Sequence, residues 1–153
     1  MTFIKGHIKT KPVQKDRPKL TKTGRAYNTQ KTKNAQRQQA FLFSVLMKKY
    51  GHENNMSFPV SPKTPLAVTV RFFHKGGVKN APKMTVPDID NLLKLTLDAM
   101  TNAGIWRDDN QITKLQSEDL WAGADGEDRI EIEVSEHIYQ KEEPQQSQLF
   151  EGV

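Results

Sequence analysis

The strongest constraint on the fold is the segment from Ile89 to Ala103, which has the pattern of one amphipathic helix. Asp88 precedes it and Gly104 follows it, and these residue types are typical of helix starts and ends. At 100° per residue its apolar side chains cover an arc of about 200°, roughly twice what packing on one sheet requires. The surplus, chiefly at Leu95 and Ala99, must be covered by another element of the chain or by a second subunit.

The rest of the chain alternates between strand-like and helix-like patterns, which indicates a small α/β (α+β) protein. We predict strands at 3–11, 66–73, 112–121 and 129–134, the last two forming a pair across the turn 123–128. A further helix is predicted at 34–50, with one side formed by Phe41, Leu42, Val45 and Leu46. We expect one domain over 1–139, a small mixed β-sheet packed by helices, and a disordered tail over 140–153.

The residue types restrict the kinds of site that the chain can build. There is no cysteine and the four histidines are far apart, so neither a disulfide nor a local zinc site is expected. A metal site would be built mainly from carboxylate oxygens, and such sites favour Mg²⁺ or Mn²⁺. No window approaches the roughly 18 consecutive apolar residues of a membrane helix, and no secretory signal is evident. We therefore expect a cytoplasmic protein with no membrane partner.

Charge is divided sharply along the chain. Residues 1–50 contain thirteen Lys or Arg and a single acid, Asp16, giving a net charge of +12, whereas the remaining residues carry a net charge of −7. Prolines and a glycine among the cations of 12–33 predict a basic surface loop. Such a loop is typical of nucleic-acid binding, although a merely solvated loop would have the same composition. The cations that we predict to contact DNA are Lys15, Arg17, Lys19, Lys22, Arg25 and Lys83.

Two acidic groups flank the predicted helix. Asp88 and Asp90 stand at its start, whereas Asp108 and Asp109 follow Trp106 beyond its end. Two acids at a helix start are commonly a cap and a favourable partner of the helix dipole, but that interpretation does not explain the second group. Several carboxylates facing DNA phosphates would repel them unless a divalent cation intervened, and such a cation also suits phosphodiester hydrolysis. A chain reversal after the helix could bring the two groups together.

Lys94 lies four residues after Asp90 on the polar side of the helix. An ordinary role there is an ion pair with Asp90 or Asp98, worth about 0.3 kcal/mol. The functional role would be to contact the scissile phosphate or to hold the attacking water. Trp106 is expected to anchor the core, and Asp108 to assist Asp109 or to form the turn.

The chain closely resembles the RusA family of Holliday junction resolvases in two motifs, Pro87-Asp88-Ile89-Asp90-Asn91-Leu92-Leu93-Lys94 and Gly104-Ile105-Trp106-Arg107-Asp108-Asp109. The resemblance implies that Asp88, Asp90 and Asp109 bind the metal and catalyse cleavage, and that Lys94 is the essential basic residue. It also implies Mg²⁺ as the cofactor, for which Mn²⁺ can substitute.

The resemblance further implies a homodimer that resolves four-way junctions and related branched DNA by paired nicks during recombination and repair. The chain departs from the family pattern just before Asp88. A run of arginines is expected there, whereas residues 79–86 contain only Lys79 and Lys83 as basic residues.

Two other functions fit parts of the sequence. A non-catalytic, structure-specific DNA-binding protein would also carry the basic loop. A phosphohydrolase of small substrates could use Asp88 and Asp90, but its nucleophile normally follows an apolar strand, and residues 83–87 are not one.

The predicted tail contains one further motif. Gln146, Leu149 and Phe150 have the spacing of the Gln-x-x-Leu-Phe peptide by which many bacterial replication and repair proteins bind the DNA sliding clamp. Because the stretch is rich in glutamine, the alternative is that this spacing arises by chance. The bacterial sliding clamp is therefore a predicted partner.

Overall fold

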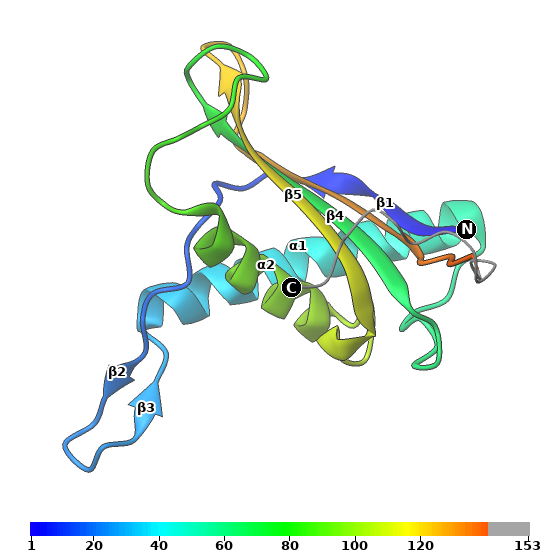
Figure 1. Cartoon of the computed structure of the whole chain (residues 1–153), viewed down its shortest axis with the longest axis horizontal. Coiled ribbons are helices and arrows are strands. Elements are labelled where there is room, and N and C mark those ends of the chain that lie inside the picture. Colours follow the sequence, from blue (N-terminus) through cyan, green and yellow to red (C-terminus); the bar gives the residue numbers. More distant parts are fainter. Residues whose placement is uncertain (141–153) are drawn as a thin grey trace, which may run out of the picture.

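The computed structural model describes residues 1–140 and shows a four-stranded mixed sheet with two helices on one face (Figure 1). This confirms the predicted α+β class. Within that part of the chain no helix has the length and apolar character needed to span a membrane. The clamp motif, Gln146, Leu149 and Phe150, lies outside the described residues and stays a prediction. The elements are β1 (Thr2–Ile8), β2 (Lys19–Leu20), β3 (Ala26–Tyr27), α1 (Gln30–Asn54), β4 (Leu66–Lys75), α2 (Ile89–Ala103), η1 (Asp109–Gln111), β5 (Ile112–Gly123) and β6 (Arg129–Glu136).

The strands follow the order β1-β6-β4-β5 across the sheet. Strands β4 and β5 are parallel, whereas β6 lies antiparallel to both of its neighbours, β1 and β4. The prediction that β5 and β6 form a pair is therefore wrong, because β4 lies between them. A parallel pair needs a long crossover, which α2 provides between β4 and β5. Strand β5 pairs with one edge of β4, and β6 pairs with the other edge.

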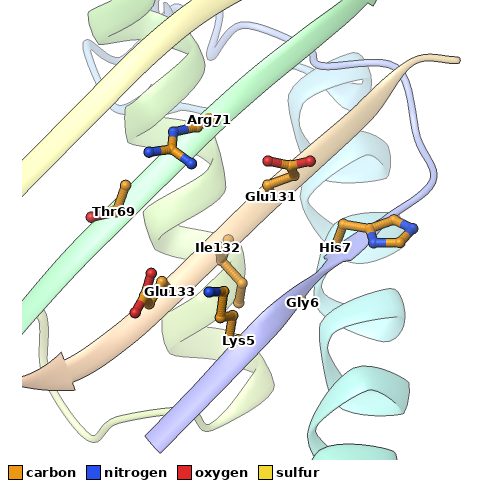
Figure 2. A pocket seen from close by; sticks show the side chains of 8 residues that line it. All are labelled: Lys5, Gly6, His7, Thr69, Arg71, Glu131, Ile132 and Glu133. Atoms are coloured by element: carbon orange, nitrogen blue, oxygen red, sulfur yellow. The ribbon is translucent and has the colours of Figure 1, made fainter. Parts of the chain in front are cut away.

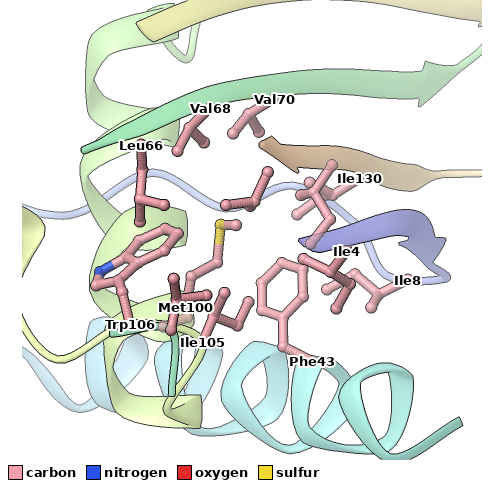
Figure 3. Packing of buried hydrophobic residues seen from close by; sticks show 14 of the residues in the cluster. Ile4, Ile8, Phe43, Leu66, Val68, Val70, Met100, Ile105, Trp106 and Ile130 are labelled. Atoms are coloured by element: carbon pink, nitrogen blue, oxygen red, sulfur yellow. The ribbon is translucent and has the colours of Figure 1, made fainter. Parts of the chain in front are cut away.

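The hydrophobic core lies between the sheet and the two helices (Figure 3). Alternate side chains of β4, β6 and β1 point into this layer, as the two-residue period of a strand requires. On α2, Leu92, Leu95, Ala99 and Met100 have no exposed surface. The wide apolar arc of α2 is thus covered within one chain, by the sheet on one side and α1 on the other, so Leu95 is unavailable to a second subunit.

Helix α1 is longer than predicted, and the predicted apolar side is only half correct, since Leu42 and Leu46 are partly buried against the core whereas Phe41 and Val45 are not. It begins after Thr29, whose hydroxyl accepts a hydrogen bond from the Thr32 backbone N–H. Phe41 and Val45 are 67% and 50% exposed. The buried side of the helix instead contains Phe43 and the polar Gln39. A polar residue at this position is compatible with burial because its Oε1 accepts a 2.8 Å hydrogen bond from the Thr96 hydroxyl of α2.

The predicted basic loop contains the short β2–β3 hairpin, which extends away from the sheet (Figure 1). The base of the loop is fixed at Asp16, the one acid in the first fifty residues. Its carboxylate accepts a hydrogen bond from Thr29, and its backbone N–H donates to the Thr32 hydroxyl. The same side chains that start α1 therefore hold the loop against the helix.

The buried contact between α1 and α2 gives a test of this packing. Gln39 Nε2 already lacks a hydrogen-bond partner, so Thr96→Val would leave both ends of the buried amide unpaired. We expect Thr96→Val to lower the free energy of unfolding by about 1–3 kcal/mol in urea titrations. The double change Gln39→Met with Thr96→Val should recover most of this loss, because it removes both partners. A double variant less stable than Thr96→Val alone would contradict this account.

Candidate functional site

The start of α2 presents charged side chains that are free to bind a ligand. Asp88 occupies the N-cap position, but its side chain makes no capping hydrogen bond. The capping interpretation of Asp88 is therefore not realised, and its carboxylate is exposed, as is that of Asp90. Lys94 is also exposed and, within residues 1–140, forms no ion pair with Asp90 or Asp98.

A surface depression of about 700 Å³ brings these side chains together with the basic loop. We call it the carboxylate hollow. The loop forms one wall because the Lys15 backbone N–H donates a 3.0 Å hydrogen bond to the Asn91 carbonyl in the first turn of α2. Lys15 and Arg17, which were predicted to contact DNA, thus line the same depression as the candidate catalytic acids. The hollow is lined by Gln14, Lys15, Asp16, Arg17, Pro18, Asp88, Asp90, Asn91 and Lys94.

The other predicted DNA-binding residues lie farther along the loop or beside it. Lys19, Lys22 and Arg25 are exposed on or beside the β2–β3 hairpin. The Lys83 ammonium instead donates 3.1 Å hydrogen bonds to the Thr85 and Val86 carbonyls, just before the carboxylates. Lys83 therefore helps to shape the approach to Asp88.

Asp98 has a partner that the sequence did not indicate. The Lys15 ammonium lies 2.9 Å from the Asp98 carboxylate, and the two side chains are 28% and 38% exposed. Because Asn91, Lys94 and Asp98 follow one another at spacings of three and four residues, they share one side of α2. Lys15 thus holds the loop along this polar side of the helix.

Asp109 lies at the opposite end of α2 from Asp88 and Asp90. The helix has 15 residues, which corresponds to a length of about 22 Å. A hydrogen bond with Asp108, slight burial, and the negative charges of Asp108 and Asp98 raise the pKa of Asp109. Within residues 1–140 no three acidic or histidine side chains lie close enough together to hold a metal ion. One chain does not bring the two predicted acidic groups together.

Asp108 and Trp106 have structural contacts in the turn that follows α2. The Asp108 carboxylate accepts a 3.1 Å hydrogen bond from the Asn110 backbone and caps η1. Trp106 is 1% exposed within the core, and its indole N–H donates to the Thr101 hydroxyl. Asp108 thus acts as a turn former and Trp106 as a core anchor, both of which were among the roles expected.

A buried pair near the site was not predicted. His74 Nε2 lies 2.6 Å from Asp119 Oδ1, and the two side chains are 8% and 7% exposed. Burial lowers the pKa of His74, against the opposing charge and hydrogen bond of Asp119, and the Lys83 charge lowers it further. Asp119 also lines a depression of about 420 Å³, the middle hollow, together with Asp88. His74 and Asp119 are 45 positions apart in the sequence. Their contact depends on the pairing of β4 with β5, so the sequence alone did not indicate it.

The outer face of the sheet has a separate depression of about 240 Å³, shown in Figure 2. Its cationic side chains, Lys5 and Arg71, lie among the glutamates of β6 (Figure 2). Arg71 is already bound to Glu118 at 2.9 Å. None of the candidate site residues lines this depression, and its charges are balanced, so it is not the functional site.

Comparisons with known proteins show which family the chain resembles. The family model described as "Endodeoxyribonuclease RusA" matches residues 9–135. A curated relative, "Crossover junction endodeoxyribonuclease rusA" of Lactococcus phage r1t, is 37% identical over 75 residues. The aligned region covers 47% of this chain and 55% of the relative, so the chain spans about half the length of that relative.

The buried histidine makes stability depend on pH in a defined direction. Because the pKa of His74 is lowered in the folded protein, the unfolded chain binds the proton more readily. The stability associated with His74 is therefore complete above about pH 6.5 and is lost as the pH falls below that value. We expect the urea midpoint of His74→Gln to fall less between pH 7 and pH 5 than that of the unchanged protein. The exposed His52→Gln serves as control, and equal falls in all three proteins would contradict the prediction.

Proposed function

Because the chain belongs to the RusA family of endodeoxyribonucleases, we propose that it is a divalent-metal-dependent endonuclease that cuts four-way DNA junctions. Membership of this family confirms the resemblance seen in the two sequence motifs. The observation that carries the proposal is the carboxylate hollow, whose lining combines the exposed acids Asp88 and Asp90 with the cations Lys15 and Arg17. Arg17 is exposed and can bind a DNA phosphate beside acids that on their own would repel it, while Lys15 holds the loop there through Asp98.

The donor atoms in the hollow fit a hard divalent cation. Asp88 and Asp90 offer exposed carboxylate oxygens, the ligands that Mg²⁺ and Mn²⁺ prefer, and Asp88 is not used in capping. We propose Mg²⁺, with Mn²⁺ as a substitute. When bound, such an ion supplies positive charge to the phosphodiester and makes water more acidic. Lys94 has no ion pair among the described residues, so its ammonium is free to contact the scissile phosphate or hold the attacking water.

The separation of Asp109 from Asp88 and Asp90 favours a site shared between two subunits. We propose that the protein is a homodimer in which Asp109 of the partner subunit completes the carboxylate hollow. Two-fold symmetry then creates two equivalent sites. Two such sites suit paired nicks on opposed strands of a junction. The buried Leu95 excludes that position from the interface.

The alternative of a small-substrate phosphohydrolase is less well supported by the fold. Strand β4 ends at Lys75, and twelve residues separate it from Asp88. Asp88 therefore does not stand at the carboxyl end of a buried strand, where such a nucleophile is normally found. A non-catalytic DNA-binding protein is distinguished by the cleavage experiment below.

The central test is Asp90→Asn. Removing this charge should lower Mg²⁺-dependent cleavage of a synthetic junction by about a thousandfold or more, because several kcal/mol of charge stabilisation are lost. Junction binding should be unchanged or tighter, because one source of repulsion disappears. Binding is measured by gel shift and cleavage on junction, duplex and a small phosphate ester, with the exposed Asp125→Asn as control. Cleavage by Asp90→Asn at the unchanged rate would remove Asp90 from the mechanism.

The shared site predicts complementation between two inactive variants. Asp90→Asn and Asp109→Asn should each be inactive, whereas subunits mixed after denaturation and refolding should regain nicking. Each mixed dimer then has one site in which both acids are intact. At equal mixing about a quarter of all sites should be intact, and they should nick one strand only. No recovered activity would place both acids in the same subunit.

A further inference from the structure

Three depressions follow one another along the segment 83–88, which precedes α2. The carboxylate hollow and the middle hollow share Asp88 in their linings. The middle hollow in turn shares Lys83, Thr85 and Pro87 with a third depression of about 380 Å³. We call this third depression the lysine hollow. It is lined by Lys11, Pro12, His74, Lys75, Lys83, Thr85, Val86, Pro87, Trp121 and Asp128.

The lysine hollow carries a surplus of positive charge. Three lysines from separate parts of the chain line it, against the single carboxylate Asp128. That carboxylate already accepts a 2.7 Å hydrogen bond from the Lys75 backbone N–H. His74 is held by Asp119, and burial lowers its pKa, which favours the neutral ring near pH 7. The hollow thus suits an anion.

Two of the three lysines are free to bind that anion. Lys11 and Lys75 are exposed, and within residues 1–140 neither forms an ion pair. The Lys83 ammonium donates to two carbonyl groups and lies 5.4 Å from the centre of the Trp121 ring. A lysine ammonium has three donors, so Lys83 retains one.

The walls of the lysine hollow are fixed by backbone hydrogen bonds. The Lys83 N–H donates to the Asp119 carbonyl, and the Trp121 N–H donates to the Ala81 carbonyl, both at 2.9 Å. Gly76, which follows Lys75 in the chain, exchanges two further backbone hydrogen bonds with Gly123. Such a wall fixes the backbone from which the lysines extend, so only their side chains must be ordered when a ligand binds.

We propose that the lysine hollow binds a backbone phosphate of the same DNA strand that enters the carboxylate hollow. This inference rests on the proposed function, since it takes DNA to be the ligand. A strand that runs along the segment 83–87 would place one phosphate by Asp88 and another between Lys11 and Lys75. The hollow therefore adds a non-cleaving contact that fixes the position of the strand.

The test is Lys11→Gln combined with Lys75→Gln, measured by junction binding without divalent metal at several salt concentrations. Each DNA phosphate that is no longer neutralised should make the slope of log affinity against log salt less steep by about 0.9. The matched control is Lys48→Gln with Lys114→Gln, which removes the same charge from exposed positions outside all three hollows. We expect the first pair to flatten the slope and the control pair to leave it unchanged.

A second measurement identifies the phosphate itself. Backbone phosphates around the junction are replaced one at a time by neutral methylphosphonates. One replacement should weaken binding of the unchanged protein while leaving the Lys11→Gln, Lys75→Gln variant unaffected. Equal slopes for the two lysine pairs, or no phosphate with this behaviour, would overturn the proposal. Because binding is measured without metal, a protein that binds junctions but does not cut them refutes the nuclease proposal alone.

Discussion

The burial of α2 between the sheet and α1 fixes the positions of the candidate catalytic groups Asp88, Asp90 and Lys94. Its apolar side chains contact both layers, and Leu92, Leu95, Ala99 and Met100 have no exposed surface. The helix can therefore neither rotate nor slide without exposing part of the core. Its first turn consequently holds Asp88 and Asp90 at the surface, and its polar side presents Lys94 and Asp98 to the basic loop. The same rigidity keeps Asp109, which follows the end of the helix, from joining Asp88 and Asp90 in one cluster, which is why a second subunit is proposed to complete the site.

The basic loop addresses the electrostatic problem that the carboxylates create. Acids that gather at a DNA-cutting site repel the substrate, and nearby cations reduce that repulsion. Here the loop is held against α1 through Asp16 and against α2 through Lys15. These contacts place Arg17 beside Asp88 and Asp90. The hairpin beyond them carries the remaining cations outward, where they would contact DNA away from the proposed cleavage site.

The lysine hollow places further cations along the segment 83–87. Few basic residues precede Asp88 in the sequence, where an arginine run was expected. The fold instead collects Lys11, Lys75 and Lys83 around one depression. If these lysines bind phosphate as proposed, positive charge before the catalytic acids is supplied by the tertiary structure. The salt dependence of binding would then depend on residues that are distant in sequence.

Local signals in the sequence determined the bounds of α2, Ile89 to Ala103, because its apolar period and the flanking residues Asp88 and Gly104 can be recognised without knowledge of the rest of the fold. They also determined the motif residues and the basic character of the loop. Only the tertiary structure decided that β4 separates β5 from β6, that Gln39 rather than Phe41 is buried, and that His74 meets Asp119. Each of these depends on contacts between residues far apart in the chain. A periodic pattern shows that a residue belongs to a helix or strand, but which partner covers it is set by the packing of the whole chain.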